Sequence, residues 1–179
     1  MRGIGEVKWH GTCNIHTAVF SETSDNKGSN MEPAERSIDV LNSLIETTID
    51  SVDGYEKAAE VVRDPSLSGM FRQFAADRRQ AVTLLRAEVV KLGGRPEDDG
   101  SVLASAHRAF LDLRSHVEKD RKAAIAEVER GEDFIKSKYE NALDDDDIAP
   151  DVRDTISDCY ETVLRGHDAA ADLKRALGA

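Results

Sequence analysis

The sequence predicts an all-α protein: a four-helix bundle with a short extra helix in the connection between the second and third helices, and an irregular N-terminal tail. Three observations support this prediction. Apolar residues recur every three or four positions in four long stretches between residues 34 and 177. Only four of the 179 residues are prolines, so long helices are not interrupted. Aromatic residues make up 5% of the chain, which indicates a core built mainly from aliphatic side chains.

The N-terminal stretch differs in character from the rest of the chain. Its first thirty residues are rich in Gly, Ser, Thr and Asn and have no helical period. We therefore expect an irregular extension over residues 1–33 and a bundle over residues 34–179. His10, Cys13 and His16 in this extension could bind a metal ion, but no second ligand motif accompanies them. We interpret their spacing as adventitious.

The first two helices are predicted over residues 34–63 and 65–92. Each has one apolar face. Asp64-Pro65 provides an N-cap and a first helical residue for the second helix, and Gly93-Gly94 ends it. Because the connection between the two helices is so short, they must run antiparallel.

The second half of the bundle begins after a polar loop. Ser101 can cap a shorter helix over residues 102–117, and long helices follow over 120–143 and 150–177, the last opened by Pro150. If the short segment carries the chain back along the bundle, the four long helices run up, down, down and up. This is the ferritin-like arrangement with one long crossover. The alternative, an array in which the short helix is an equal member, is disfavoured by its length.

Charge and cysteine content exclude several classes of protein. The formal net charge of −11 argues against nucleic acid and anionic membranes as partners, because both bind basic surfaces. No run approaches the roughly 20 apolar residues of a membrane span, and the N-terminus lacks the apolar core of a secretory signal. Cys13 and Cys159 imply no disulfide framework. We therefore expect a cytoplasmic protein.

Ionisable side chains are predicted on the core faces of all four long helices. Because a helix turns by about 100° per residue, Glu132 falls in the middle of the apolar stripe of the third long helix, and Glu129 at its edge. Arg78 lies in the middle of the second helix's apolar face. Glu56 and His167 each lie about 40° from a central residue of their stripe. Counting from the tight turns places all five within about one helical turn in height.

The cluster has two kinds of interpretation. Glu56, Glu129, Glu132 and His167 could bind a metal ion, and three carboxylates with one imidazole suit iron or manganese. However, the second helix has Arg78 where a ferritin-like dimetal site needs Glu-x-x-His, and its charge would repel cations. The other interpretation is an ion-pair network in which Arg78 pairs with Glu132, and Glu129 or Glu56 pairs with His167. A structural network, a mononuclear or partial metal site and a carboxylate-bridged dimetal centre all remain open.

Six short segments also occur in an informative order: Leu41-Asn-Ser-Leu-Ile-Glu-Thr, Gly54-Tyr-Glu-Lys-Ala-Ala-Glu, Leu92-Gly-Gly-Arg-Pro-Glu, His107-Arg, Glu129-Arg-Gly-Glu-Asp and His167-Asp. They resemble a bacterial family of small ferritin-like four-helix-bundle proteins that is catalogued as a domain of unknown function. The resemblance covers about residues 36–177. It implies a ferritin-like fold in the bacterial cytoplasm, and no established activity or cofactor.

Our leading functional prediction is a ferritin-like, non-storage bundle protein related to stress or metals, with a buried Glu/Arg/His cluster and no established catalytic activity. One alternative is a carboxylate-bridged metal oxidase or peroxidase that handles peroxide or oxygen. Another is a helical interaction module that forms a homodimer through an outward face. Phe134 is a candidate for that face because it points away from the apolar stripe of its helix, and the short helix over residues 102–117 is the other candidate. A divalent metal ion and a second copy of the chain are the expected partners.

Overall fold

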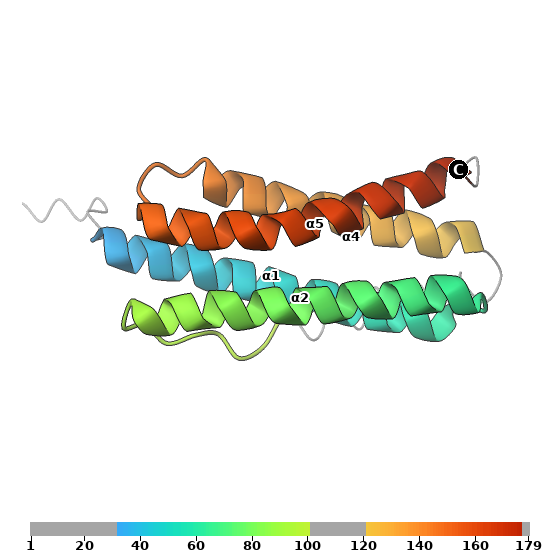
Figure 1. Ribbon diagram of the computed structural model, residues 1–179, viewed down its shortest axis with the longest axis horizontal. Coiled ribbons are helices and arrows are strands. Elements are labelled where there is room, and N and C mark those ends of the chain that lie inside the picture. Colours follow the sequence, from blue (N-terminus) through green and yellow to red (C-terminus); the bar gives the residue numbers. More distant parts are fainter. Residues whose placement is uncertain (1–31, 101–120, 177–179) are drawn as a thin grey trace, which may run out of the picture. The chain divides into compact units, whose positions relative to one another are not determined.

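The computed structural model describes residues 32–100 and 121–176, and Figure 1 shows that they form a bundle of α-helices. The helices are α1 (Pro33–Val61), α2 (Pro65–Lys91), α4 (Arg121–Leu143) and α5 (Pro150–Ala176). No strand occurs in the described part of the chain, so the all-α four-helix prediction is confirmed. The short helix expected over residues 102–117 lies outside the described residues, as does the expected N-terminal extension apart from its last two residues.

The turn between α1 and α2 forms for the reasons seen in the sequence. The Asp64 carboxylate accepts hydrogen bonds from the backbone N–H groups of Ser66 and Leu67, at 2.9 and 3.1 Å, which are two of the donors that a helix start leaves free. At the other end of α2, Gly93 has a φ of 79°, a left-handed conformation that glycine adopts without strain. Both ends of α2 are therefore set by local chemistry.

The directions of the helices follow from contacts along their length. α1 packs beside α2 and α4, and α5 packs beside α2 and α4. For α1 and α4, the contacts that set the direction are Thr48–Tyr139 and the bond from Arg36 to Asp145, two residues after the end of α4. For α2 and α5 they are Lys91–Asp151 and Arg78–Thr162. In each pair the residue number rises on one helix as it falls on the other, so both pairs are antiparallel. The four helices thus run up, down, down and up.

A strap of extended chain, residues 94–100, leads from the end of α2 back along α1 (Figure 1). Its first residue lies against Ile38 and its last against Ile49. Asn42 exchanges two hydrogen bonds with the strap backbone, at 3.0 and 3.1 Å, and Arg86 donates two more to strap carbonyls, at 3.0 and 2.9 Å. These bonds hold the chain in the direction that a crossover to the start of α4 requires.

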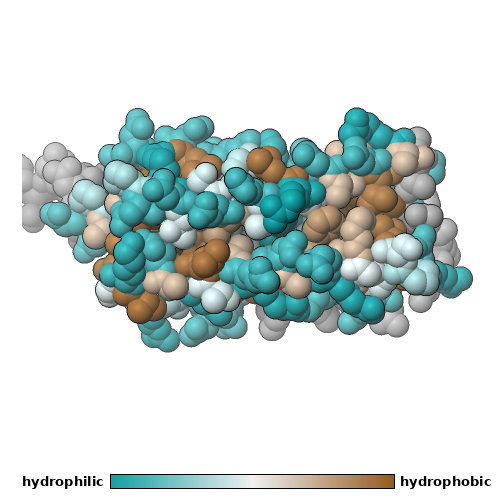
Figure 2. All heavy atoms as spheres, in the orientation of Figure 1, coloured by the Kyte–Doolittle hydropathy of each residue, from teal (hydrophilic) through white to brown (hydrophobic). Residues whose placement is uncertain are grey.

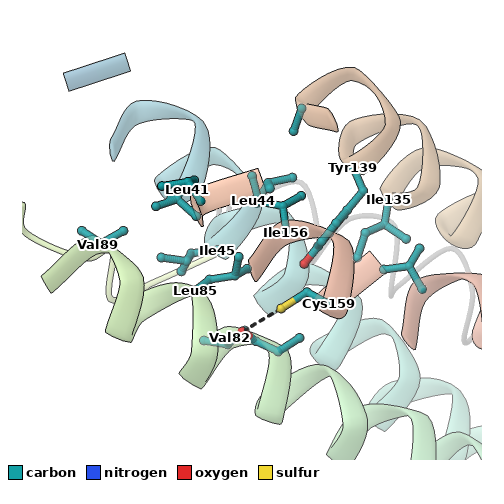
Figure 3. Close-up of a cluster of buried hydrophobic side chains, with 14 of the residues drawn as sticks. Leu41, Leu44, Ile45, Val82, Leu85, Val89, Ile135, Tyr139, Ile156 and Cys159 are labelled. Atoms are coloured by element: carbon teal, nitrogen blue, oxygen red, sulfur yellow. Dashed lines mark hydrogen bonds between the residues drawn. The ribbon is translucent and has the colours of Figure 1, made fainter. Parts of the chain in front are cut away.

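The buried apolar side chains form two separate clusters. The main core takes side chains from all four helices, and Figure 3 shows Cys159 of α5 reaching toward α2 within it. The end core lies toward the C-terminus of α1 and the N-terminus of α2. Its buried members are Val52, Tyr55, Ala58, Ala59, Leu67, Phe71, Ala75 and Ile125. Among the helices described, none is long and apolar enough to cross a lipid bilayer.

Candidate functional site

A buried ion pair lies between the two cores. Nη2 of Arg78, on α2, donates a hydrogen bond of 2.7 Å to Oε2 of Glu132, on α4. The side chains of Arg78 and Glu132 are 0% and 2% exposed. Both residues occupy the middle of the apolar face of their helix, which is why the bundle closes over them. The predicted pairing of Arg78 with Glu132 is confirmed.

Arg78 also connects α2 to α5. Its Nη1 donates to the backbone carbonyl of Thr162 at 2.7 Å and to the Thr162 hydroxyl at 3.2 Å. The Nε atom of Arg78 has no hydrogen-bond partner among the described residues. One guanidinium group therefore joins three of the four helices.

α1 contributes a tyrosine and a serine to this site. The ring of Tyr55 lies beside the guanidinium of Arg78, 5.8 Å from its central carbon, and its side chain is 3% exposed. The Tyr55 hydroxyl is buried without a hydrogen-bond partner in the described part of the chain. Burial, followed by the negative charge of Glu132, raises the pKa of Tyr55 above its ordinary value. Ser51 Oγ lies 3.5 Å from Glu132 Oε1, which makes only a weak hydrogen bond.

α5 contributes a glycine at the same height. A Cβ atom at Gly166 would lie 2.7 Å from each of three polar atoms: Arg78 Nη2, Glu132 Oε2 and the Tyr55 hydroxyl oxygen. These three atoms converge on the glycine backbone, and any larger residue would push them apart. We name the four residues Tyr55, Arg78, Glu132 and Gly166 the central cluster.

In the central cluster, the opposite charges of Arg78 and Glu132 compensate each other out of contact with solvent. Burial raises the pKa of Glu132 above its ordinary value, and the charge of Arg78 opposes that rise. The guanidinium of Arg78 has a fixed donor geometry that matches a carboxylate. Such a pair can hold helices in register, and a cation brought to Glu132 would be repelled by Arg78.

Comparison with known sequences adds one finding. The family model described as a domain of unknown function, DUF2383, matches residues 36–145. The chain belongs to the DUF2383 family. No curated protein matches the sequence. Tyr55, Arg78 and Glu132 lie within the part of this DUF2383 chain that the family model covers, whereas Thr162 and Gly166 lie beyond it.

Two of the predicted metal ligands of the DUF2383 chain lie near its surface in ion pairs of their own. Glu56 pairs with Arg79, and both side chains are about half exposed. Glu129 pairs with Lys174 of α5. Both glutamates sit at the edge of an apolar stripe, where the side chains of the adjacent helix decide their partners.

His167 also differs from the prediction. Its Nε2 lies 3.1 Å from Asp133 Oδ1 and its Nδ1 lies 3.3 Å from Asp168 Oδ1, so the expected pairing with Glu129 or Glu56 was wrong. The imidazole is 23% exposed, because its position beside the stripe directs it to the seam between α4 and α5.

The predicted ligands are therefore not gathered at one point. Within residues 32–100 and 121–176, no three His, Cys, Asp or Glu side chains are placed to hold a metal ion together. The structure places the four predicted ligands, Glu56, Glu129, Glu132 and His167, in separate ion pairs instead.

Sequence reasoning did not identify Thr162 and Gly166 as members of the site. A signal for Gly166 was available, because a glycine on the core face of a helix often marks a close approach of another group. The hydrogen bond to the Thr162 carbonyl had no such signal, since every residue has a carbonyl.

Cys159 is another chemically notable buried side chain in the described part of this DUF2383 chain. Its Sγ lies 3.8 Å from the Ala81 carbonyl oxygen in the main core. Burial raises the pKa of the Cys159 thiol to about 12. At neutral pH it therefore stays a thiol and acts as a small apolar side chain.

Proposed function

We propose that this protein is a ferritin-like bundle that works as a helical scaffold for contacts between proteins, and that its central cluster sets helix register. The observation that carries the proposal is the position of Arg78. Its fully buried guanidinium bonds α4 and α5 at the height where a carboxylate-bridged metal centre would need ligands.

The ferritin-like assignment is supported by the up, down, down, up order of the helices and by the strap that starts a long crossover. The scaffold assignment is supported by the partners of the acidic groups. Glu56, Glu129 and Glu132 each already face a basic side chain. A metal ion would have to displace these partners before it could bind.

The outer surface favours contact with another protein. Phe134 is 57% exposed on α4, with the Lys138 ammonium 5.5 Å from its ring centre. A large aromatic side chain at the surface is typical of residues buried when two proteins associate. We propose a second copy of the chain as the first partner to test.

Metal analysis tests the choice between scaffold and oxidase. The full chain would be purified without chelator from cells grown with added iron and manganese, as wild type and as Glu132→Gln and His167→Ala. The scaffold proposal expects less than about one tenth of a metal ion per chain in all three proteins. Stoichiometric iron or manganese in the wild type that is lost in both variants would establish a metal site and overturn the proposal.

Sedimentation velocity over a wide concentration range tests the contact surface. We expect concentration-dependent association of the wild type, weakened in Phe134→Ser and unchanged in Leu84→Ser, a matched control at a second exposed apolar residue. A wild type that stays monomeric at the highest concentration would refute self-association.

A further inference from the structure

The two halves of α5 are held in the bundle by different forces. In the first half, Val152, Ile156, Cys159 and Val163 are all 0% exposed within the main core. From residue 164 onward, the buried residues of the described helix are Gly166 and Ala170. A glycine and an alanine remove little apolar surface from water, so the second half gains little from the hydrophobic effect.

Polar contacts tie the second half mainly to α4. Among the described residues, the two ion pairs that leave this half are His167–Asp133 and Lys174–Glu129, and both reach α4. These side chains are partly exposed, so solvent weakens the attraction. Among the described residues, this half of α5 contributes no buried side chain larger than alanine to a contact with α2.

The facing surface of α2 is apolar and incompletely covered. Met70 and Phe74 of α2 and Leu173 of α5 are only partly buried against the end core. Figure 1 shows the end of α5 diverging from α2, and Figure 2 shows hydrophobic atoms exposed between the two helices at that end of the bundle. The buried members of the end core come from α1, α2 and α4, so most of this core can stay in place without the second half of α5.

A hinge region, residues 162–166, lies between the two halves of α5. In an α-helix the carbonyl of residue 162 accepts the N–H of residue 166. Here the Thr162 carbonyl also accepts a 2.7 Å hydrogen bond from Arg78. The residue that shares this carbonyl is Gly166, whose backbone is the most adaptable in a helix. Arg78 thus anchors the last turn of the first half of α5. Directly after it, at Gly166, the helix backbone is easier to bend.

We propose that the C-terminal half of α5, from residue 164 to residue 176, opens away from α2 as one unit, pivoting between Thr162 and Gly166. The first half stays packed in the main core. The opening uncovers Tyr55 of the end core and gives water access to the side of Glu132 that Gly166 covers.

Hydrogen exchange of the full chain, followed by mass spectrometry with peptides that resolve α5, tests this inference. Amides 164–172 are expected to exchange at least about tenfold faster than amides 156–163, with nearly equal protection among themselves, because a detached helix of this length is only marginally stable in water and its hydrogen bonds open together. Protection that instead declines step by step toward residue 176 would indicate ordinary fraying and overturn the inference. Equal protection of both halves would also overturn it.

A matched pair of lysine variants makes the test specific. Lys174→Ala removes the ion pair with Glu129 and is expected to speed exchange of amides 164–172 by about two- to fivefold. Lys91→Ala removes contacts with Glu88 and Asp151 at the opposite end of the bundle and is expected to leave these amides unchanged. If Lys174→Ala accelerates both halves of α5 equally, the half-helix does not open as a unit and the proposal fails.

Discussion

Replacing Glu132 with glutamine tests the central cluster most directly. The amide oxygen of Gln can still accept the hydrogen bond from Arg78 Nη2, so the shape of the site is kept. What the variant removes is the negative charge. The guanidinium of Arg78 is then left without a compensating charge, and it cannot turn to water from a position that is 0% exposed.

The expected loss of stability follows from that burial. Removing one partner of a buried ion pair destabilises a protein by about 3–5 kcal/mol, because the remaining charge is left without compensation. Arg78 keeps its two hydrogen bonds to Thr162, so we expect a value near the lower end, about 3 kcal/mol. For a chain of this size, this corresponds to a fall in melting temperature of roughly 10 °C.

Urea unfolding followed by circular dichroism measures the effect. Glu127→Gln is the matched control on the same helix, because Glu127 pairs with Arg130 at the surface and its loss should cost at most about 0.5 kcal/mol. The double variant Arg78→Met, Glu132→Leu should recover most of the lost stability, since no charge is then stranded. A Glu132→Gln protein as stable as the Glu127→Gln protein would refute the reasoning.

Three further predictions follow from other contacts. Gly166→Ala should destabilise the protein by about 1–3 kcal/mol through crowding, whereas Gly69→Ala, with no described atom near its Cβ position, should stabilise it by up to about 1 kcal/mol in the same urea assay. Arg36→Ala should lower stability at pH 7 but not in strong acid. The hydrogen bond from Arg36 lowers the pKa of Asp145 below its ordinary 3.8, so its contribution is present above that value and is lost as the pH falls through the lowered pKa. Unfolding curves of both proteins from pH 2 to 7 check this, and a constant difference would contradict it. Cys159, studied in a variant without the other cysteine, should react with a thiol reagent at pH 8 only as fast as the protein unfolds, and stoichiometric labelling within seconds would contradict its burial.

Much of the fold could be predicted because local signals were strong. The helices expected over 34–63 and 65–92 span Pro33–Val61 and Pro65–Lys91, and those expected over 120–143 and 150–177 span Arg121–Leu143 and Pro150–Ala176. The signals that start and end these helices act between neighbouring residues, so they can be recognised without knowledge of tertiary contacts. They are the prolines at the first helical position, Asp64 as N-cap and the paired glycines after α2.

The candidate site was predicted only where a residue lay in the middle of an apolar stripe. Arg78 and Glu132 are so central in their apolar stripes that both face the core, where their opposite charges pair. Glu56 and His167 lie about 40° from the centre, where a long side chain can turn to either helix seam. There the outcome depends on neighbours such as Arg79 and Asp133, which no single helix pattern specifies.

The hydrogen bonds from Asn42 and Arg86 tie the start of the crossover to the hairpin that it leaves. A cut after residue 100 would therefore yield two fragments, one carrying α1, α2 and the strap, the other carrying α4 and α5. Each fragment would hold one member of the Arg78–Glu132 pair, and neither could shield its charge alone. Association of the two fragments would be driven both by the pairing of the Arg78 and Glu132 charges and by the burial of apolar side chains. The chain is therefore suited to complementation from separately expressed fragments.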